Sequence, residues 1–140
     1  MESLSDSVLG VLTWDAELTS WNSDVILPDG SRAEMSVLDE EKEGVRVIES
    51  ARPYFAGLIK NYKALRQYIA DDLLDVAIRN WSADAHDVPR EVAHLKIEAI
   101  HIIPGLFTEV FFDDSGIFAG HVIIVRTDKE GGKVDVTIEG

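Results

Sequence analysis

The chain has 140 residues, of which 26 are acidic and 13 basic, so its formal net charge is −13 and its pI is near 4.5. The length fits a single domain over residues 1–140, large enough to bury a core. The charge disfavours direct binding to nucleic acid and to anionic membranes, and it favours encounters with basic proteins or cations. Cysteine is absent, which excludes disulfides and thiolate ligands.

We expect no targeting signal at the beginning of the sequence. Residues 1–6 lack the basic and apolar regions of a secretory signal peptide. No apolar run approaches the roughly 20 residues that a membrane helix needs. We therefore expect a cytoplasmic protein that does not associate with membranes.

The first third has the pattern of short strands joined by turns. Residues 8–14 are apolar and β-prone, and residues 21–27 alternate between apolar and polar positions. Residues 28–31, Pro-Asp-Gly-Ser, predict a turn. A third alternating strand follows over residues 33–37.

From Val45 to about Trp81 the apolar period changes from two to about 3.6, which predicts helix with one continuous apolar stripe. Pro53 lies within this stretch, so a kink or a helix start is expected near Arg52. The length favours two helices with a break near Asn61.

The last third returns to strand patterns. Asp87 is suited to cap a short helix that begins at Pro89. Beyond it, turn sequences separate apolar or alternating runs. The predicted strands cover residues 95–103, 107–112, 117–125 and 134–138.

The order of strands, helices and strands predicts an α+β fold. We expect a mostly antiparallel sheet, with strands before and after a central helical segment and with helices packed on one face. Residues 117–125 are apolar on both faces, which is typical of a strand that is covered on both sides. A second copy of the chain is one way to cover the other face, so a homodimer is a hypothesis.

Two histidines and two aspartates are candidates for catalytic chemistry. His121 follows the turn residues Asp113 and Asp114, and His101 lies on the apolar face of its own strand. A histidine beside carboxylates is typical of acid–base pairs and of metal sites. An extended strand rises about 3.3 Å per residue, however, which separates His121 from the aspartates along the chain. Each histidine is expected to be a buried, hydrogen-bonded core residue unless the sheet brings the two together.

Two acidic clusters are candidate binding residues for a basic protein partner. The first is a loop that comprises Asp39, Glu40, Glu41 and Glu43. The second lies on a helix and comprises Asp71, Asp72 and Asp75. Three carboxylates spaced in this way on a helix face can hold a divalent cation. Because no neighbouring sequence follows a metal-loop pattern, we expect a solvated acidic face and predict no metal site. The loop is the better docking candidate.

Common catalytic motifs are absent from the sequence. The chain has no G-x-S-x-G elbow, Walker-type loop, dinucleotide glycine fingerprint or H-E-x-x-H helix. No cofactor is predicted. Catalytic groups need not be close in sequence, so an enzyme stays open.

The C-terminal third carries an Asp-Asp-x-x-x-Phe-x-Gly-His order between Phe111 and Val125, followed by Asp128, Gly131 and the terminal Ile138-Glu139-Gly140. It resembles the C-terminal signature of a small bacterial family, domain of unknown function twenty-two sixty-two. Leu9 to Leu12 followed by Trp21, and Ile69 to Leu74 leading to Asn80-Trp81, are similar to the same family. Ala119 stands where an aromatic residue is common in that family. The resemblance covers nearly the whole chain and implies a bacterial, single-domain cytosolic protein, but no activity.

Two functions of different classes remain open. The first is a non-catalytic binding module with an acidic surface that takes a basic protein partner, as toxin-neutralising immunity proteins do. Its binding should weaken with salt. The second is a metal-assisted or acid–base enzyme that uses His101 and His121 with Asp113 or Asp114. The missing motifs favour the first.

Overall fold

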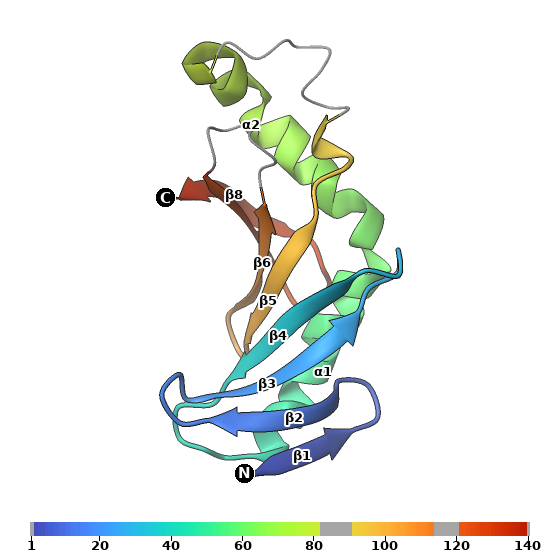
Figure 1. The fold of residues 1–140 in the computed structure, drawn as a ribbon, viewed down its shortest axis with the longest axis vertical. Coiled ribbons are helices and arrows are strands. Elements are labelled where there is room, and N and C mark those ends of the chain that lie inside the picture. The colour runs from blue at the N-terminus through green and yellow to red at the C-terminus, as the bar shows by residue number, and fades with distance from the viewer. Residues whose placement is uncertain (1, 82–90, 114–120, 140) are drawn as a thin grey trace.

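The computed structural model describes residues 2–81, 91–113 and 121–139, and for residues 74–81 it describes the backbone only. Within them the chain forms one eight-stranded sheet, whose strands lie side by side in chain order (Figure 1). The strands are β1 (Ser3–Asp6), β2 (Gly10–Asp15), β3 (Ser20–Ile26), β4 (Arg32–Leu38), β5 (Ile97–Ile103), β6 (Phe107–Asp113), β7 (Val122–Thr127) and β8 (Lys133–Glu139). The helical segment between β4 and β5 comprises α1 (Val45–Lys60), the 3-10 helix η1 (Tyr62–Ala64) and α2 (Leu65–Trp81).

The expectation of an α+β fold with helices packed on one sheet face is wrong, because the structure is largely β. β4 pairs with β5 in parallel, with Met35 opposite Ile100, and this pair joins both groups of strands into one sheet. The other neighbouring strands pair in antiparallel fashion. A parallel pair needs a crossover connection. Within the described residues α1 and α2 belong to that connection, and the continuous sheet is the dominant element.

The predicted helix break is present, whereas no helix starts near Arg52. α1 ends at Lys60 and η1 begins at Tyr62, so the break lies at Asn61. Pro53 lies inside α1, and the helix continues through it. β1 escaped prediction because Ser3–Asp6 is mostly polar. The short helix predicted from Pro89 begins outside the described residues.

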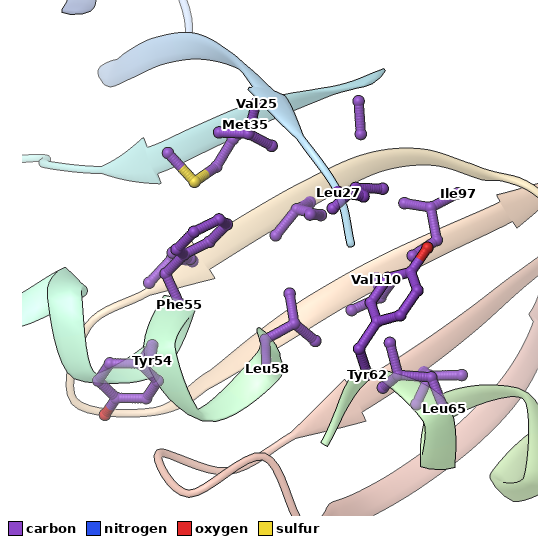
Figure 2. Packing of buried hydrophobic residues seen from close by; sticks show 14 of the residues in the cluster. Val25, Leu27, Met35, Tyr54, Phe55, Leu58, Tyr62, Leu65, Ile97 and Val110 are labelled. Carbon is purple, nitrogen blue, oxygen red and sulfur yellow. The ribbon is translucent and has the colours of Figure 1, made fainter. Parts of the chain in front are cut away.

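The core is formed where side chains of the sheet meet those of α1 and η1. Met35, Ile100 and Val110 are opposite one another on β4, β5 and β6, and all three are buried. Figure 2 shows Phe55 and Leu58 of α1 pointing toward these strands. α1 contacts β4, β5 and β6, whereas α2 contacts β7 and β8. The helical segment therefore runs along most of the second half of the sheet.

A close backbone contact fixes α1 against the turn between β7 and β8. A methyl group on Gly57 would lie 2.4 Å from the carbonyl oxygen of Lys129, which is well inside van der Waals contact. Gly131 has a φ of +87°, in the left-handed region that favours glycine. The Asn61 Nδ2 donates to the carbonyl oxygen of Glu130 at 2.6 Å. The turn thus has one defined position on the helix.

The hypothesis of a homodimer has lost part of its basis. Ile123, Ile124 and Val125 are all buried in the single chain, although neighbouring residues of a strand point to opposite faces. β7 lies between β6 and β8. A second copy is not needed to bury Ile124. Residues 117–120 of the predicted strand lie outside the described residues.

Candidate functional site

A row of polar residues crosses the sheet on the face opposite the core. The row comprises Ser36, His101, Glu109, Arg126 and Asp135, each opposite the next in the strand register. Their immediate neighbours in the chain, such as Met35 and Ile100, point into the core. The alternation of the strands therefore places these five side chains together, although the residues are far apart in sequence.

His101 lies in the middle of this row and is half-buried. Its ring contacts the ring of Phe111, with 4.6 Å between the ring centroids. Burial lowers the pKa of His101, while the negative charges of Glu109 and Glu34 act in the opposite direction. The imidazole is therefore neutral at pH 7, the state in which it can accept a proton.

A hollow of about 230 Å³ opens beside His101. Its lining residues are Leu18, Ser20, Ser36, Leu38, His101, Ile102, Ile103 and Glu109. Sites for small molecules usually measure about 300–1,000 Å³. This hollow is below that range, although a neighbouring one of about 420 Å³ shares His101, Ser36 and Leu18 with it.

Glu109 is bonded to Arg126 and, among the described residues, not to His101. Arg126 donates from Nε to Glu109 at 3.0 Å and from Nη1 to Asp135 at 3.1 Å. The hydrogen bond with Asp135 is the main cause that raises the pKa of Arg126, against the effect of burial and together with Glu109. The second half of the polar row is thus an ion-pair network across β6, β7 and β8.

His121 and Asp113 lie away from His101. Asp113 at the end of β6 is opposite Val122, the residue that follows His121, and both Asp113 and His121 make interactions within the fold. Glu109, which lies opposite His101 in the strand register, is four positions before Asp113, which corresponds to about 13 Å along a strand. The structure therefore brings His121 close to Asp113 and keeps both apart from His101. Asp114 lies outside the described residues.

In the acidic loop, Asp39 has a different environment from the glutamates. Asp39 is 3% exposed, and its carboxylate accepts hydrogen bonds from Trp21 Nε1 at 2.8 Å and from the amides of Glu43 and Gly44 at 2.8 and 2.9 Å. Burial alone would raise the pKa of Asp39, but the hydrogen bonds from Trp21, Gly44 and Glu43 together outweigh it and hold this pKa below its usual value. Asp39 positions the loop, and the exposed glutamates are what a partner can reach.

Those glutamates border a hollow of about 560 Å³ between the loop and the turn that joins β5 to β6. Its acidic members are Asp39, Glu40, Glu41 and Glu43, and its apolar members include Leu38, Val47, Ile103, Pro104 and Leu106. Leu106 is 66% exposed. An exposed large apolar side chain beside carboxylates is a combination that composition alone could not reveal.

The second acidic cluster lies on α2. Asp71 accepts a hydrogen bond from Gln67 at 2.7 Å, and Asp72 pairs with Lys133 of β8 at 2.8 Å. Asp75 belongs to α2, but its side chain lies outside the described set. The ion pair ties α2 to β8, so Asp72 already has a structural partner.

The described parts of the chain contain no group of three or more histidine, cysteine or carboxylate side chains that could hold a metal ion. None of their helices combines the length and the apolar composition that crossing a membrane requires.

Sequence reasoning missed Ser36, Glu109, Arg126 and Leu106. Glu109 lies on the predicted strand 107–112, but Arg126 follows the predicted strand 117–125, and the predicted turn at residues 113–116 implies a register that does not place the two opposite each other. Leu106 follows the predicted Pro104-Gly105 turn, where an apolar residue has no strand face to occupy. Ser36 could not have been found, since its position opposite His101 depends on the parallel pair of β4 and β5.

Comparison with known proteins gives a family but no described relative. No curated protein and no solved structure matches the chain. A family model described as "Uncharacterized protein conserved in bacteria (DUF2262)" matches residues 6–138. The match extends over the whole span and does not single out the signature between Asp113 and His121, which stays a prediction. The chain belongs to this uncharacterised bacterial family.

Proposed function

We propose that this protein is a non-catalytic binding module that docks a basic protein segment in the hollow between the acidic loop and the β5–β6 turn. The observation that carries the proposal is that three glutamates and an exposed leucine line the same hollow. These residues are Glu40, Glu41, Glu43 and Leu106. Such a surface is complementary to a segment in which an apolar residue stands between lysines or arginines.

Charge supports a basic partner. The whole chain carries −13, which attracts cations over distances longer than contact. Within the loop, Lys42 is paired with Glu2 at 2.8 Å, and Arg46 lies 3.6 Å from Glu43. Glu40 and Glu41 have no cationic partner among the described residues, so their charges are available to a partner.

The hollow is also held in place before any partner arrives. Asp39 fixes the loop through its three hydrogen bonds. The amide of Gly105 donates to the hydroxyl of Tyr54 on α1 at 2.9 Å, which fixes the β5–β6 turn. A preformed surface loses little conformational entropy on binding. The exposed side chain of Leu106 can then act as a fixed apolar contact.

The test is an NMR titration with a short lysine-rich peptide that has one central phenylalanine. We expect saturable shifts at the amides of the loop and of Leu106, and weaker binding when salt rises from about 0.01 M to about 0.15 M, which shortens the screening length. A peptide with serine in place of phenylalanine should bind more weakly. Salt-independent binding, or shifts spread over the surface without saturation, would contradict the proposal.

Matched variants separate the site from the overall charge. Replacing Glu40, Glu41 and Glu43 by glutamine should weaken peptide binding about tenfold. The control replaces three exposed glutamates elsewhere, Glu17, Glu98 and Glu139, and changes the net charge equally. Leu106→Ser should weaken binding, whereas Leu18→Ser, at a similarly exposed leucine, should not. Equal effects of both triple variants would contradict a local site.

One observation favours a second candidate, acid–base chemistry at His101. A neutral, half-buried imidazole lines a hollow that is also lined by Ser20 and Ser36. This reading requires a small molecule to enter the hollow. An NMR fragment screen should then give hits that shift His101 and Ser36 and are lost in His101→Gln. A screen without saturable hits there would remove this candidate.

A further inference from the structure

A further hollow, of about 520 Å³, is lined mostly by residues that follow the helix break at Asn61, and it shares no residue with the hollow at the acidic loop. It is bounded by the β3–β4 turn, by η1 with the start of α2, and by the segment that leads into β5. Figure 2 shows Tyr62 reaching from the helical segment toward Leu27 and Ile97 at this edge of the core. Its volume is within the range of about 300–1,000 Å³ for small-molecule sites. We call it the Arg66 cleft.

The Arg66 cleft is positive in a strongly negative protein. Lys63, Arg66 and Lys96 line it, against one carboxylate, Asp29, which leaves an excess of two positive charges. Elsewhere in the described residues the bonded cations have carboxylate partners, as in the pairs Lys42–Glu2, Arg46–Glu43, Arg52–Asp6, Arg126–Glu109 and Lys133–Asp72. Lys63 and Lys96 have no carboxylate partner among those residues. Cations gathered around one hollow without carboxylate partners make that hollow attractive to an anion.

Arg66 is held in a fixed orientation within the cleft. Its Nε and Nη2 donate to the carbonyl oxygen of Leu95 at 2.9 and 2.6 Å. Its guanidinium carbon lies 5.3 Å from the ring centroid of Tyr62 and 5.4 Å from that of Phe112. These contacts use two of the five N–H groups that a guanidinium offers. The remaining donors have no partner in the described parts of the chain and stay available to an oxyanion.

Asp29 does not neutralise this arrangement. Its carboxylate accepts from the hydroxyl and amide of Ser31 at 2.6 and 3.0 Å and from the hydroxyl of Tyr62 at 3.2 Å. The hydrogen bonds from Ser31 are the main cause that lowers the pKa of Asp29, with further lowering by Tyr62 and Arg66 and an opposing effect of burial. The carboxylate is thus bonded to hydroxyl and amide donors, and it forms no hydrogen bond with Arg66.

We propose that the Arg66 cleft binds a phosphate monoester of a small molecule. A phosphate monoester carries about −1.5 to −2 at pH 7 and offers three acceptor oxygens, which match the local excess of two positive charges. A carboxylate carries one negative charge and matches it less well. The apolar walls formed by Tyr62, Ala70 and Val92 accommodate a ring or a hydrocarbon part of the ligand.

The experiment is an NMR titration of the full chain with phenyl phosphate, inorganic phosphate and benzoate at constant ionic strength. Phenyl phosphate should cause saturable shifts at residues 29–31, 62–67 and 92–96. Inorganic phosphate should bind at the same residues more weakly, and benzoate should bind about tenfold more weakly than phenyl phosphate. The absence of saturable shifts would overturn the proposal, and equal binding of benzoate would overturn the choice of phosphate.

Variants that leave the fold intact decide whether the cleft is the site. Lys63→Gln with Lys96→Gln changes two exposed side chains and should weaken phenyl phosphate binding about tenfold or more. The control, Arg46→Gln with Lys129→Gln, removes the same charge elsewhere and should leave binding unchanged. Arg66→Gln should abolish binding, with thermal unfolding used to check that the protein still folds. Equal loss in both double variants would show a general charge effect and overturn the site.

Discussion

Asp39 offers the sharpest test of how the acidic loop is built. In Asp39→Asn the side chain keeps its shape but has one acceptor oxygen instead of two. The present Oδ2 accepts from Trp21 Nε1 and from the amide of Gly44, and Oδ1 accepts from the amide of Glu43. If the asparagine oxygen takes the place of Oδ2, its NH₂ group faces the Glu43 amide, and two donors meet. The reverse orientation leaves the buried Trp21 N–H without an acceptor.

Either orientation has a predictable cost. Hydrogen bonds to a charged group contribute about 1.5–3 kcal/mol, and an unsatisfied buried donor costs about 1–3 kcal/mol. One lost bond of this kind, partly relieved by relaxation of the exposed Glu43, gives a decrease of about 2 kcal/mol in the free energy of unfolding at pH 7. Folding lowers the pKa of Asp39. The stabilisation is therefore present above the unfolded pKa of about 3.9 and is lost as pH falls through the lower folded value.

The assay is urea unfolding followed by tryptophan fluorescence, at pH 7 and at several lower pH values. The control is Asp15→Asn, since Asp15 also accepts two amide hydrogen bonds, from Glu17 and Leu18 at 3.0 and 3.2 Å, but in an exposed turn. It should cost less than about 1 kcal/mol. Equal losses in the two variants, or a difference from wild type at Asp39 that does not shrink in acid, would refute the reasoning.

Two further predictions concern the α1 contact and the polar row. Gly57→Ala should destabilise the protein by about 3 kcal/mol because its methyl group would collide with the Lys129 carbonyl. The control is Gly30→Ala, where the backbone conformation is strained for alanine but no atom lies within 4 Å of the added methyl group. It should cost about 1 kcal/mol in the same unfolding assay. In an NMR pH titration His101 should show a pKa below 6.5, and Glu109→Gln should lower it further, because Glu109 favours the protonated ring. Because folding lowers the pKa of His101, this residue should reduce the free energy of unfolding as pH falls below about 6.5. A measured His101 pKa at or above its ordinary value would contradict the burial of the ring.

The strands and the helix break could be predicted because their signals are local. Alternation over residues 21–27 corresponds to β3, and the change of period after Val45 corresponds to the start of α1. The fold class could not be obtained in this way. It depends on the pairing of β4 with β5, two strands separated by the whole helical segment, and no local period encodes which strands become neighbours. β1 was missed because its polar sequence has no strand pattern of its own, and it forms a strand by pairing with β2.

The candidate site was predicted only in part, and Asp39 shows why. In the sequence it is one of four acidic residues in a charged loop, and nothing distinguishes it from Glu40 or Glu41. Its burial depends on Trp21, which is 18 residues earlier. The Arg66 cleft was missed because its cations come from separate segments and are outnumbered by acidic residues throughout the chain. The net charge of a chain does not reveal where in the fold charges of one sign are grouped.

That segregation explains how one acidic chain can offer sites of opposite sign. The acidic loop precedes α1, whereas Lys60 is the last residue of α1 and Lys63 follows it in η1. A helix of 16 residues is about 24 Å long, which exceeds the screening length of about 8 Å at physiological salt. The helix dipole favours anions at its beginning and cations at its end, so both charge groups are in stabilising positions. The two sites should therefore be independent: the glutamine variant of Glu40, Glu41 and Glu43 should bind phenyl phosphate as wild type does, and the Lys63 and Lys96 variant should bind the basic peptide as wild type does.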